Sequence, residues 1–384
     1  MNNPDMALSV LVMLVGGLIV IAILIKACAD RLSIPPLIGY LAVGLLVRLL
    51  DTRLDFLHQG ELGVFEFLAR IGLIALLFRA GLESNLKELL KQLKSASFIW
   101  VGNVALSGLA GYAACRYLLG VDFLPSLVVG TAMTATSVGI PVAIWDREGA
   151  LNSDNGRRFI DVAELDDITG VLAMALLFSL IPVLRESGGQ ANLWTSVGAK
   201  AAYFGAALAV FSAGCVLFSH FLEERITHFL EEIQCQRDST IVVAGIGFVI
   251  AAAASLVGFS AAIGAFFAGL VFSRDPERVR IDASFDSIYE LFTPFFFINI
   301  GMTLAPDALG GALVPGLILL AAAVLGKLLG AGLPALTCGM SSAALLAVSM
   351  VPRAEITMVI MKRGHQMGPG VVPDNIFAGM VLVS

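Results

Sequence analysis

Several carboxylates stand in a stretch whose composition is otherwise that of a membrane-spanning helix. The stretch reads FIDVAELDDITGVLAMALLFSLI over residues 159–181; Asp161 lies near its start, and the three carboxylates Glu164, Asp166 and Asp167 follow deeper within it. A carboxylate at the centre of an inserted helix costs about 2.5–3.5 kcal/mol, so three of them indicate a function. On a helix Asp166 and Asp167 point about 100° apart, so one can face an aqueous cleft while the other reaches a neighbouring helix. The chemistry indicated is the binding of ions within a membrane.

A single lysine lies in a second apolar stretch. Lys327 is the one charged residue in AAAVLGKLLGAGLPAL, residues 321–336. Desolvation and an opposite charge act on such an ammonium in opposing directions, so it is either paired or deprotonated, and an aspartate is the economical partner. The spacing of Gly326 and Gly330 allows another helix to approach closely. A structural ion pair, or a position nearer the helix end, is the alternative for Lys327 and for Asp167.

Two further apolar stretches carry helix-breaking residues at matching places. The first reads GTAMTATSVGIPVAIW (130–145) and the second LLAVSMVPRAEITMVIM (345–361). Paired interruptions in two halves of a chain are typical of transporter binding sites, because unwound backbone survives in hydrocarbon only beside protein or a hydrated cavity. A simple proline kink in each helix is the alternative. The residues expected at the crossing of the two stretches are Thr134, Thr136, Ser137, Gly139, Pro141, Pro352, Arg353 and Glu355.

The composition requires a membrane around these stretches. The 384 residues are 58% hydrophobic and 14% charged, and the mean hydropathy is +0.89. A span needs about 20 apolar residues. On this criterion we predict an all-α polytopic protein with thirteen spans, at residues 6–25, 33–47, 62–81, 96–115, 123–145, 159–184, 201–222, two within 239–273 separated near 258–260, 288–304, 311–336, 343–361, and from 371 onward.

The distribution of Lys and Arg predicts the orientation of these spans. With the N-terminus outside, the cytoplasmic connections hold thirteen basic residues: Lys26, Arg31, Lys87, Lys91, Lys94, Arg147, Arg157, Arg158, Arg225, Arg237, Arg274, Arg278 and Arg280. The outer side holds seven: Arg48, Arg53, Arg116, Arg185, Lys200, Lys362 and Arg363. The positive-inside rule therefore favours an outer N-terminus and a cytoplasmic C-terminus.

Six predicted spans precede the seventh span and six follow it. This is the number that an inverted repeat of two six-helix halves requires. The stretch SHFLEERITHFLEEIQCQ (219–236) keeps apolar residues on one helical stripe, so we expect it to extend the seventh span as an amphipathic helix.

The chain stops within an apolar run, and we expect the natural protein to continue beyond Ser384. The five cysteines contain no C-x-x-C, and no metal-binding cluster is visible.

The quoted motifs together resemble a known family. TATSVGIP (134–141), AELDDITG (163–170), FFFINIGM (295–302), GKLLGAG (326–332) and MVPRAE (350–355) resemble the bacterial monovalent cation:proton antiporters of the second cation/proton antiporter family, in order and over nearly the whole chain. The resemblance implies two inverted six-helix repeats with crossed discontinuous helices. It also implies a homodimer in the bacterial inner membrane, with an elevator-type movement of one part of each protomer.

The resemblance assigns roles to parts of the chain and to single residues. It implies a panel or dimerisation part at 1–90 and 238–304, a core transport part at 91–187 and 305–384, and a linker helix at 188–237. It implies that Asp167 binds a cation or a proton in turn and that Asp166 pairs with Lys327. Relatives with two aspartates and this lysine are associated with electrogenic sodium/proton exchange, whereas the potassium efflux relatives carry Gln-Asp.

Two residues depart from the family pattern. Glu164 stands where relatives mostly have an apolar residue, and Arg70 in LARIGLIALLF is likewise unexpected. Glu164 can therefore act as an additional titrating group or pair with Arg70.

The expected function is exchange of a monovalent cation for H⁺, without enzymatic activity or a cofactor; Na⁺ is the favoured cation, and the sequence leaves K⁺ and Li⁺ open. Potassium/proton antiport and sodium-coupled solute symport are the alternatives. An ion channel is the rival from another class, because it has no obligatory coupling. An intramembrane aspartyl protease is disfavoured, because its two aspartates converge from different helices and no G-x-G-D occurs.

Overall fold

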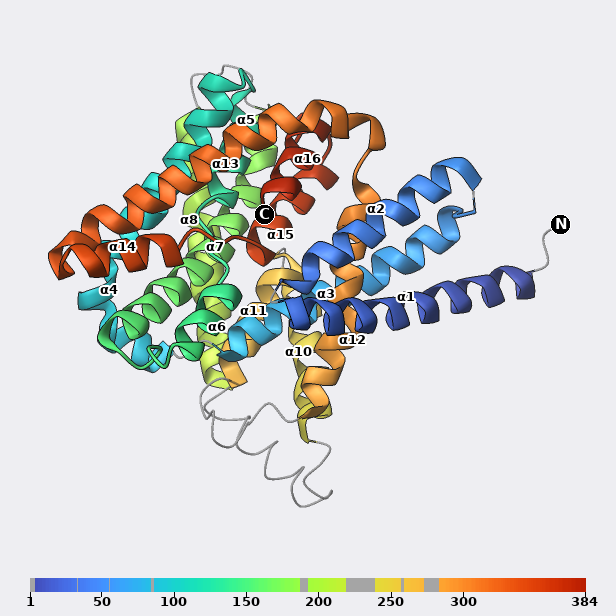
Figure 1. The fold of residues 1–384 in the computed structure, drawn as a ribbon, viewed down its shortest axis with the longest axis horizontal. Helices are drawn as coiled ribbons and strands as arrows, with labels where there is room; N and C mark the ends of the chain where they lie inside the picture. The colour runs from blue at the N-terminus through green and yellow to red at the C-terminus, as the bar shows by residue number, and fades with distance from the viewer. Residues whose placement is uncertain are drawn as a thin grey trace.

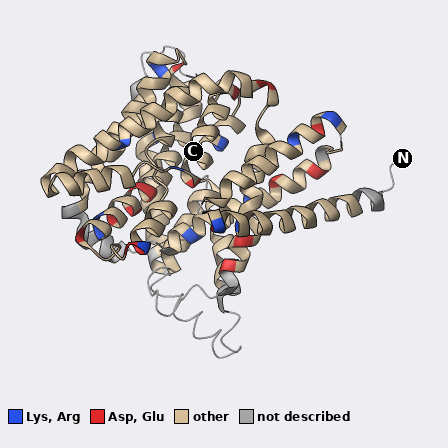
Figure 2. Cartoon of the chain, in the orientation of Figure 1, with Lys and Arg blue, Asp and Glu red and all other residues tan. Residues whose placement is uncertain are grey.

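All regular structure in the described residues is helical, as the sequence predicts (Figure 1). The computed structural model describes residues 4–32, 34–54, 56–83, 86–186, 193–218, 239–256, 259–272 and 283–384. A helix satisfies its own backbone hydrogen bonds, which is why apolar segments of this kind fold as helices in lipid. Lys, Arg, Asp and Glu are thinly spread over the ribbon (Figure 2).

The described helices follow one another along the chain in two sets. In the first half of the chain they are α1 (Pro4–Leu32), α2 (Pro36–Leu54), α3 (Gln59–Glu83), α4 (Leu86–Ala113) with the π-helical turn Ala114–Leu118, α5 (Phe123–Ala132), α6 (Gly139–Arg147), α7 (Asp154–Glu186) and α8 (Leu193–Phe218). In the second half they are α10 (Ser239–Leu256), α11 (Ala261–Phe272), α12 (Ala283–Thr303), α13 (Pro306–Ala335) with the 3₁₀ turn Leu336–Cys338, α14 (Met340–Ser349), α15 (Glu355–Gln366) and α16 (Asp374–Val383).

Every predicted span contains helix where it is described, but several bounds differ. The first span is part of α1, which continues to Leu32. The last helix begins at Asp374 and not at Val371, because Val371 lies in a turn in which its N–H donates to the Gly368 carbonyl. Five described helices are long and apolar enough to cross a membrane by themselves. The number of crossings stays a prediction.

Both interrupted stretches are unwound and not merely kinked. The helix α5 ends at Ala132 and α6 begins at Gly139, so residues 133–138 are not helical. The helix α14 ends at Ser349 and α15 begins at Glu355, so residues 350–354 are not helical. Pro352 lies in its unwound segment, whereas Pro141 is the third residue of α6, a first-turn position that does not need a backbone N–H. The alternative of a simple kink at each proline is therefore wrong.

The helices pack in two groups. The first group contains α1–α3 and α10–α12, in which α12 packs against α2 and α3, and α11 packs against α3 and α10. The second group contains α4–α7 and α13–α16, in which α13 packs against α4, α14 and α16, and α15 packs against α5. The helix α8 contacts α7 of the second group and α11 of the first. Figure 1 shows the second group on the left, and α1–α3 with α12 on the right.

Glycines let helix backbones touch inside each group. A Cβ on Gly44 of α2 would lie 2.0 Å from the Ile298 carbonyl oxygen of α12, and one on Gly81 of α3 would lie 2.1 Å from the Phe266 carbonyl oxygen of α11. In the second group, Gly326 and Gly330 of α13 lie against α4, which is the close helix that their spacing predicts.

Two predictions about loops have different outcomes. Lys362 is predicted in an outer loop, but it lies in α15 and only 8% of its surface is exposed. It is buried because its ammonium reaches α12. The predicted amphipathic extension at 219–236 lies outside the described residues. Of the predicted linker at 188–237, the structure describes α8, and the residues on either side of α8 lie outside the described residues.

Candidate ion-binding site

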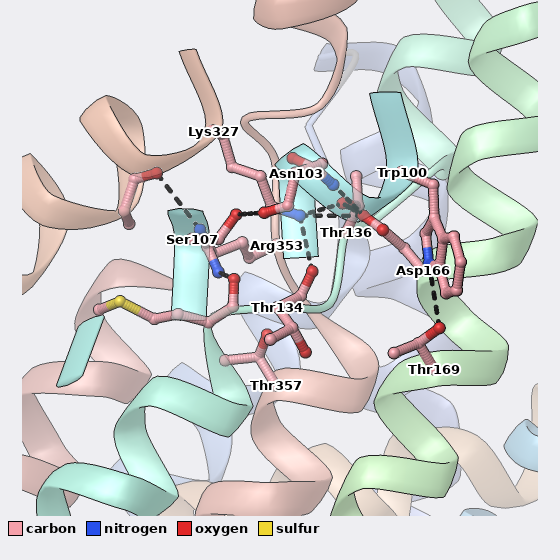
Figure 3. A network of polar contacts seen from close by, with 12 residues as sticks. Trp100, Asn103, Ser107, Thr134, Thr136, Asp166, Thr169, Lys327, Arg353 and Thr357 are labelled. Atoms are coloured by element: carbon pink, nitrogen blue, oxygen red, sulfur yellow. Dashed lines mark hydrogen bonds and ion pairs between the residues drawn. The ribbon is translucent and has the colours of Figure 1, made fainter. Parts of the chain in front are cut away.

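The end of α5 exposes three successive backbone carbonyls, and the second half of the chain supplies a donor to each. The carbonyls of Ala132, Met133 and Thr134 lack partners within the helix because α5 stops there. They accept hydrogen bonds from Thr357 Oγ1 at 2.9 Å, from Arg353 Nη1, and from Lys327 Nζ at 2.6 Å, respectively (Figure 3). The unwound segment therefore persists because α13 and α15 complete its hydrogen bonding.

The two unwound segments also touch each other directly. The backbone N–H of Ser137 donates to the Pro352 carbonyl oxygen at 2.8 Å. Arg353 extends the contact, because its Nη2 donates to the Ala323 carbonyl of α13 at 3.2 Å. Arg353 thus places its positive charge against a carbonyl group at the C-terminal end of α5, where a cation is favoured. Gly139 and Pro141 begin the helix that follows the crossing.

Asp166 and Lys327 form a fully buried ion pair at this crossing. Neither side chain is exposed (0%), and Lys327 Nζ lies 3.0 Å from Asp166 Oδ2. The same ammonium donates to Thr136 Oγ1 at 2.7 Å and to the Thr134 carbonyl, so its three protons are all used. A buried pair offsets its desolvation only when such further hydrogen bonds are present.

The Asp166 carboxylate has two more donors besides the lysine. Thr136 Oγ1 lies 2.6 Å from Asp166 Oδ2, and the side-chain amide of Asn103 in α4 donates to the same oxygen (Figure 3). Four elements therefore meet at one carboxylate: α4, the first unwound segment, α7 and α13. Asp166 is held in place by the fold.

Asp167 has a different environment from its neighbour. Its side chain is half-buried, and within the described part of the chain no hydrogen bond to its carboxylate is found. The charges that act on it are those of Glu355, Asp166, Lys327 and Glu164. One turn later, a Cβ on Gly170 would lie 3.1 Å from Ile356 Cγ2 and 3.4 Å from Ala135 Cβ, so α7 passes close to the start of α15 and to the first unwound segment there. Asp167 is thus a carboxylate beside the crossing whose oxygens are open to a ligand.

Glu164 and Arg70 belong to different surroundings. Glu164 is half-buried on α7, one turn before Asp167. Arg70 has a side chain 69% exposed and pairs with Glu66 of its own helix, with Nη2 and Oε1 2.7 Å apart. The structure therefore gives Arg70 a local partner in place of Glu164. Glu355, at the first position of α15, is half-buried.

Sequence reasoning missed Asn103 and Thr357. Asn103 is fully buried in α4, in a span without charged residues, and it is the one residue outside the predicted set that bonds the carboxylate of the pair in the described residues. The available signal was an amide beside Gly102 in an apolar run, since polar side chains in such helices usually bond to another helix. Thr357 could be found from its place one turn after Arg353.

The site suits a weakly held monovalent cation better than a resident metal. Among the described residues, no group of three or more His, Cys, Asp and Glu is placed to hold a metal ion. One open carboxylate beside unwound backbone offers oxygen ligands, which hard cations prefer.

The chain is similar to known proteins both in sequence and in fold. The chain is 27% identical to the high-affinity Na⁺/H⁺ antiporter NhaS3 of Synechocystis sp. (88% of this chain, 79% of the relative). It is also 27% identical to the Na⁺/H⁺-K⁺ antiporter GerN of Bacillus cereus (92% of this chain, 87% of the relative). The sodium proton antiporter MjNhaP1 from Methanocaldococcus jannaschii shares the fold, with a TM-score of 0.74 at 16% identity over 100% of this chain and 97% of that one. The sequence model of the transmembrane sodium/hydrogen exchanger matches residues 18–384, and the chain therefore belongs to the sodium/hydrogen exchanger family.

Proposed function

We propose that this protein exchanges Na⁺ for H⁺ across a bacterial inner membrane and that Asp167 carries both ions in turn. The observation that carries the proposal is the contrast between two adjacent carboxylates. Asp166 is buried and bonded by Asn103, Thr136 and Lys327, whereas Asp167 is half-buried beside the crossing with its oxygens uncommitted. A carboxylate can neutralise its charge with either a proton or a cation, and the two compete for it.

Occupancy of Asp167 provides the coupling. If the site reorients only when this carboxylate is neutralised, each Na⁺ carried one way requires a proton carried the other way. Reorientation with an empty, charged carboxylate is unfavourable, because a bare charge in hydrocarbon is costly. Glu164, one turn away on the side of the α7 N-terminus, is an additional titrating group in this scheme.

Lys327 makes the exchange electrogenic in this proposal. If Na⁺ draws Asp166 away from Lys327, the ammonium loses its counter-charge in a buried site and gives up its proton. A second proton then moves for each Na⁺. The ion pair at 3.0 Å supports this step because it places the two groups in direct contact.

The two helix groups correspond to the moving parts of an elevator. The second group, α4–α7 and α13–α16, holds every predicted site residue and corresponds to the transport core expected at 91–187 and 305–384. The first group, α1–α3 and α10–α12, corresponds to the panel expected at 1–90 and 238–304, which stays in place and joins two protomers in a homodimer.

An inverted repeat is supported by the pairing of helices in the first group. The second span of one half packs on the third span of the other half in both directions: α2 meets α12 at Gly44 and Gly301, and α11 meets α3 at Gly269 and Gly81. The fourth spans, α4 and α13, pack on each other, as do α5 and α15 from the two broken spans. A two-fold relation between the halves produces such reciprocal contacts.

Potassium/proton antiport is the second candidate. The name of the relative GerN includes K⁺ as well as Na⁺. The Asp166–Asp167 pair and Lys327 favour sodium in this chain, whereas a sodium-coupled symporter would need a site for an organic solute.

Proteoliposomes loaded with a pH-sensitive dye test the proposal. With a proton gradient imposed, we expect added NaCl to dissipate it, KCl to do so less, and the rate to change when valinomycin and K⁺ set the membrane voltage. A cation-independent proton leak would exclude exchange, and a response that requires an organic solute would favour symport.

A further inference from the structure

Lys362 is a buried charge that the exchange mechanism does not use. It lies in α15, two turns after Glu355, and is 8% exposed, while Arg363 beside it is exposed. Its Nζ donates to the Asn299 carbonyl oxygen at 3.2 Å and to Thr303 Oγ1, both on α12. Thr303 Oγ1 in turn donates to the Asn299 carbonyl at 2.7 Å.

This contact joins the two helix groups. The helix α12 packs against α2 and α3 in the first group, whereas α15 packs against α5, α7 and α16 in the second. Lys362 follows the crossing by roughly 10 Å along the axis of α15, at a rise of about 1.5 Å per residue. Thr303 is the last residue of α12, so the contact ties the C-terminal ends of two helices on one side of the ion site.

Lys362 lies on α15, whereas its partners lie on helices of the first group, so the surroundings of its ammonium depend on the position of α15. An ammonium removed from water is costly unless it is bonded, and here both bonded partners are neutral. The carboxylate whose charge acts on it is that of Glu66 of α3, which is again in the first group. Because all three partners move with the first group, a displacement of the second group would remove them together.

We propose that Lys362 is a positioning residue that ties the transport core to the panel in this conformation and must release α12 in each exchange cycle. The inference rests on the proposed function, because it assumes that the two groups move relative to each other. A contact made in one conformation and lost in the other sets the ratio of their populations and the rate of leaving the first.

Reversible cross-linking tests the release. In a cysteine-free background, Lys362→Cys and Thr303→Cys are combined, joined with a reducible bifunctional thiol reagent, and reconstituted for the dye assay. We expect the cross-link to reduce Na⁺-dependent exchange at least tenfold and reduction to restore it, while the same reagent leaves each single-cysteine variant unchanged. Exchange that continues at the uncross-linked rate would overturn the proposal, since the two helix ends would then not separate.

If the double-cysteine variant does not exchange ions before cross-linking, removal of the side chains tests the role of Lys362 instead. Lys362→Met and Thr303→Val should each change the maximal exchange rate at least threefold in the same direction, and the double variant should match the larger single effect. Arg363→Met is the matched control and should behave like the unmodified protein. Independent, additive effects, or no effect of Lys362→Met, would remove Lys362 from this role. Loss of exchange in the unmodified protein would instead refute the proposed function.

Discussion

At the scale of single residues, the neighbouring carboxylates Asp166 and Asp167 have different contacts and therefore different proposed roles. Asp166 is bonded by three donors from other elements, so in this conformation it neutralises the charge of Lys327. Asp167 takes the position on the helix that faces away from this network, where its oxygens stay open. Two adjacent aspartates can therefore serve as a structural anchor and as an ion ligand.

Asp167→Asn should abolish exchange. The amide keeps the size of the side chain but neither binds a proton near neutral pH nor neutralises a cation. Na⁺-dependent dye dequenching should fall to the level of protein-free vesicles. Asp154→Asn, an exposed aspartate at the start of the same helix, is the control and should retain exchange. Robust transport by the Asp167 variant would show that the carrier carboxylate is elsewhere.

Lys327→Gln should leave exchange but remove most of its voltage sensitivity. Glutamine retains donors for the Thr134 carbonyl and for Asp166, while the second titrating group is lost. The measurement is the Na⁺-dependent rate at two voltages set by valinomycin and K⁺ gradients. If the ratio of the two rates equals that of the unmodified protein, Lys327 does not contribute a transported proton.

At the scale of helices, small residues set how closely the elements approach. The contact of α2 with α12 brings backbone to backbone: the added Cβ of Gly44 would meet Ile298, and that of Gly301 would lie 2.2 Å from the Leu41 carbonyl oxygen. Packing and not hydrophobicity drives helix association in lipid, so such contacts are what hold the first group together.

Gly44→Ala should therefore separate α2 from α12 and destabilise the protein. Overpacking at a tight contact typically costs about 1–3 kcal/mol, and here the clash is with backbone that cannot rotate away. The thermal midpoint in detergent, followed by size-exclusion chromatography, should fall clearly. Gly16→Ala in α1 is the control, because nothing lies within 4 Å of the added Cβ. Equal midpoints for the two variants would contradict the packing argument.

At the scale of the whole molecule, the sequence predicts the ionisable groups and the two interruptions, because charges and prolines inside apolar runs are visible in one dimension. It does not predict Asn103 as a partner of Asp166, since an amide in an apolar span becomes informative only when the facing helix is known. It places Lys362 in a loop, because a lysine near a span end usually reaches water; here the adjacent α12 supplies its oxygens instead. The contacts of Asn103 and of Lys362 both depend on which helix lies beside them, and a single sequence does not contain this information.

The orientation in the membrane is the prediction that belongs to the molecule as a whole. With the N-terminus outside, exposed Cys28 near the end of α1 lies on the cytoplasmic side, and exposed Asp307 at the start of α13 lies on the outer side. In a variant with Cys28 as its only cysteine, a membrane-impermeant maleimide should label inverted vesicles and spare intact cells.

A second variant, with Asp307→Cys in a cysteine-free background, should give the opposite pattern. Because the excess of Lys and Arg fixes the side of every connection at once, both labels must reverse together if the orientation is wrong. Labelling of both positions from the same side would instead mean that an even number of crossings lies between residues 28 and 307, whereas nine predicted spans separate them. That result would also undo the proposed two-fold relation between the halves, which depends on the same count of crossings.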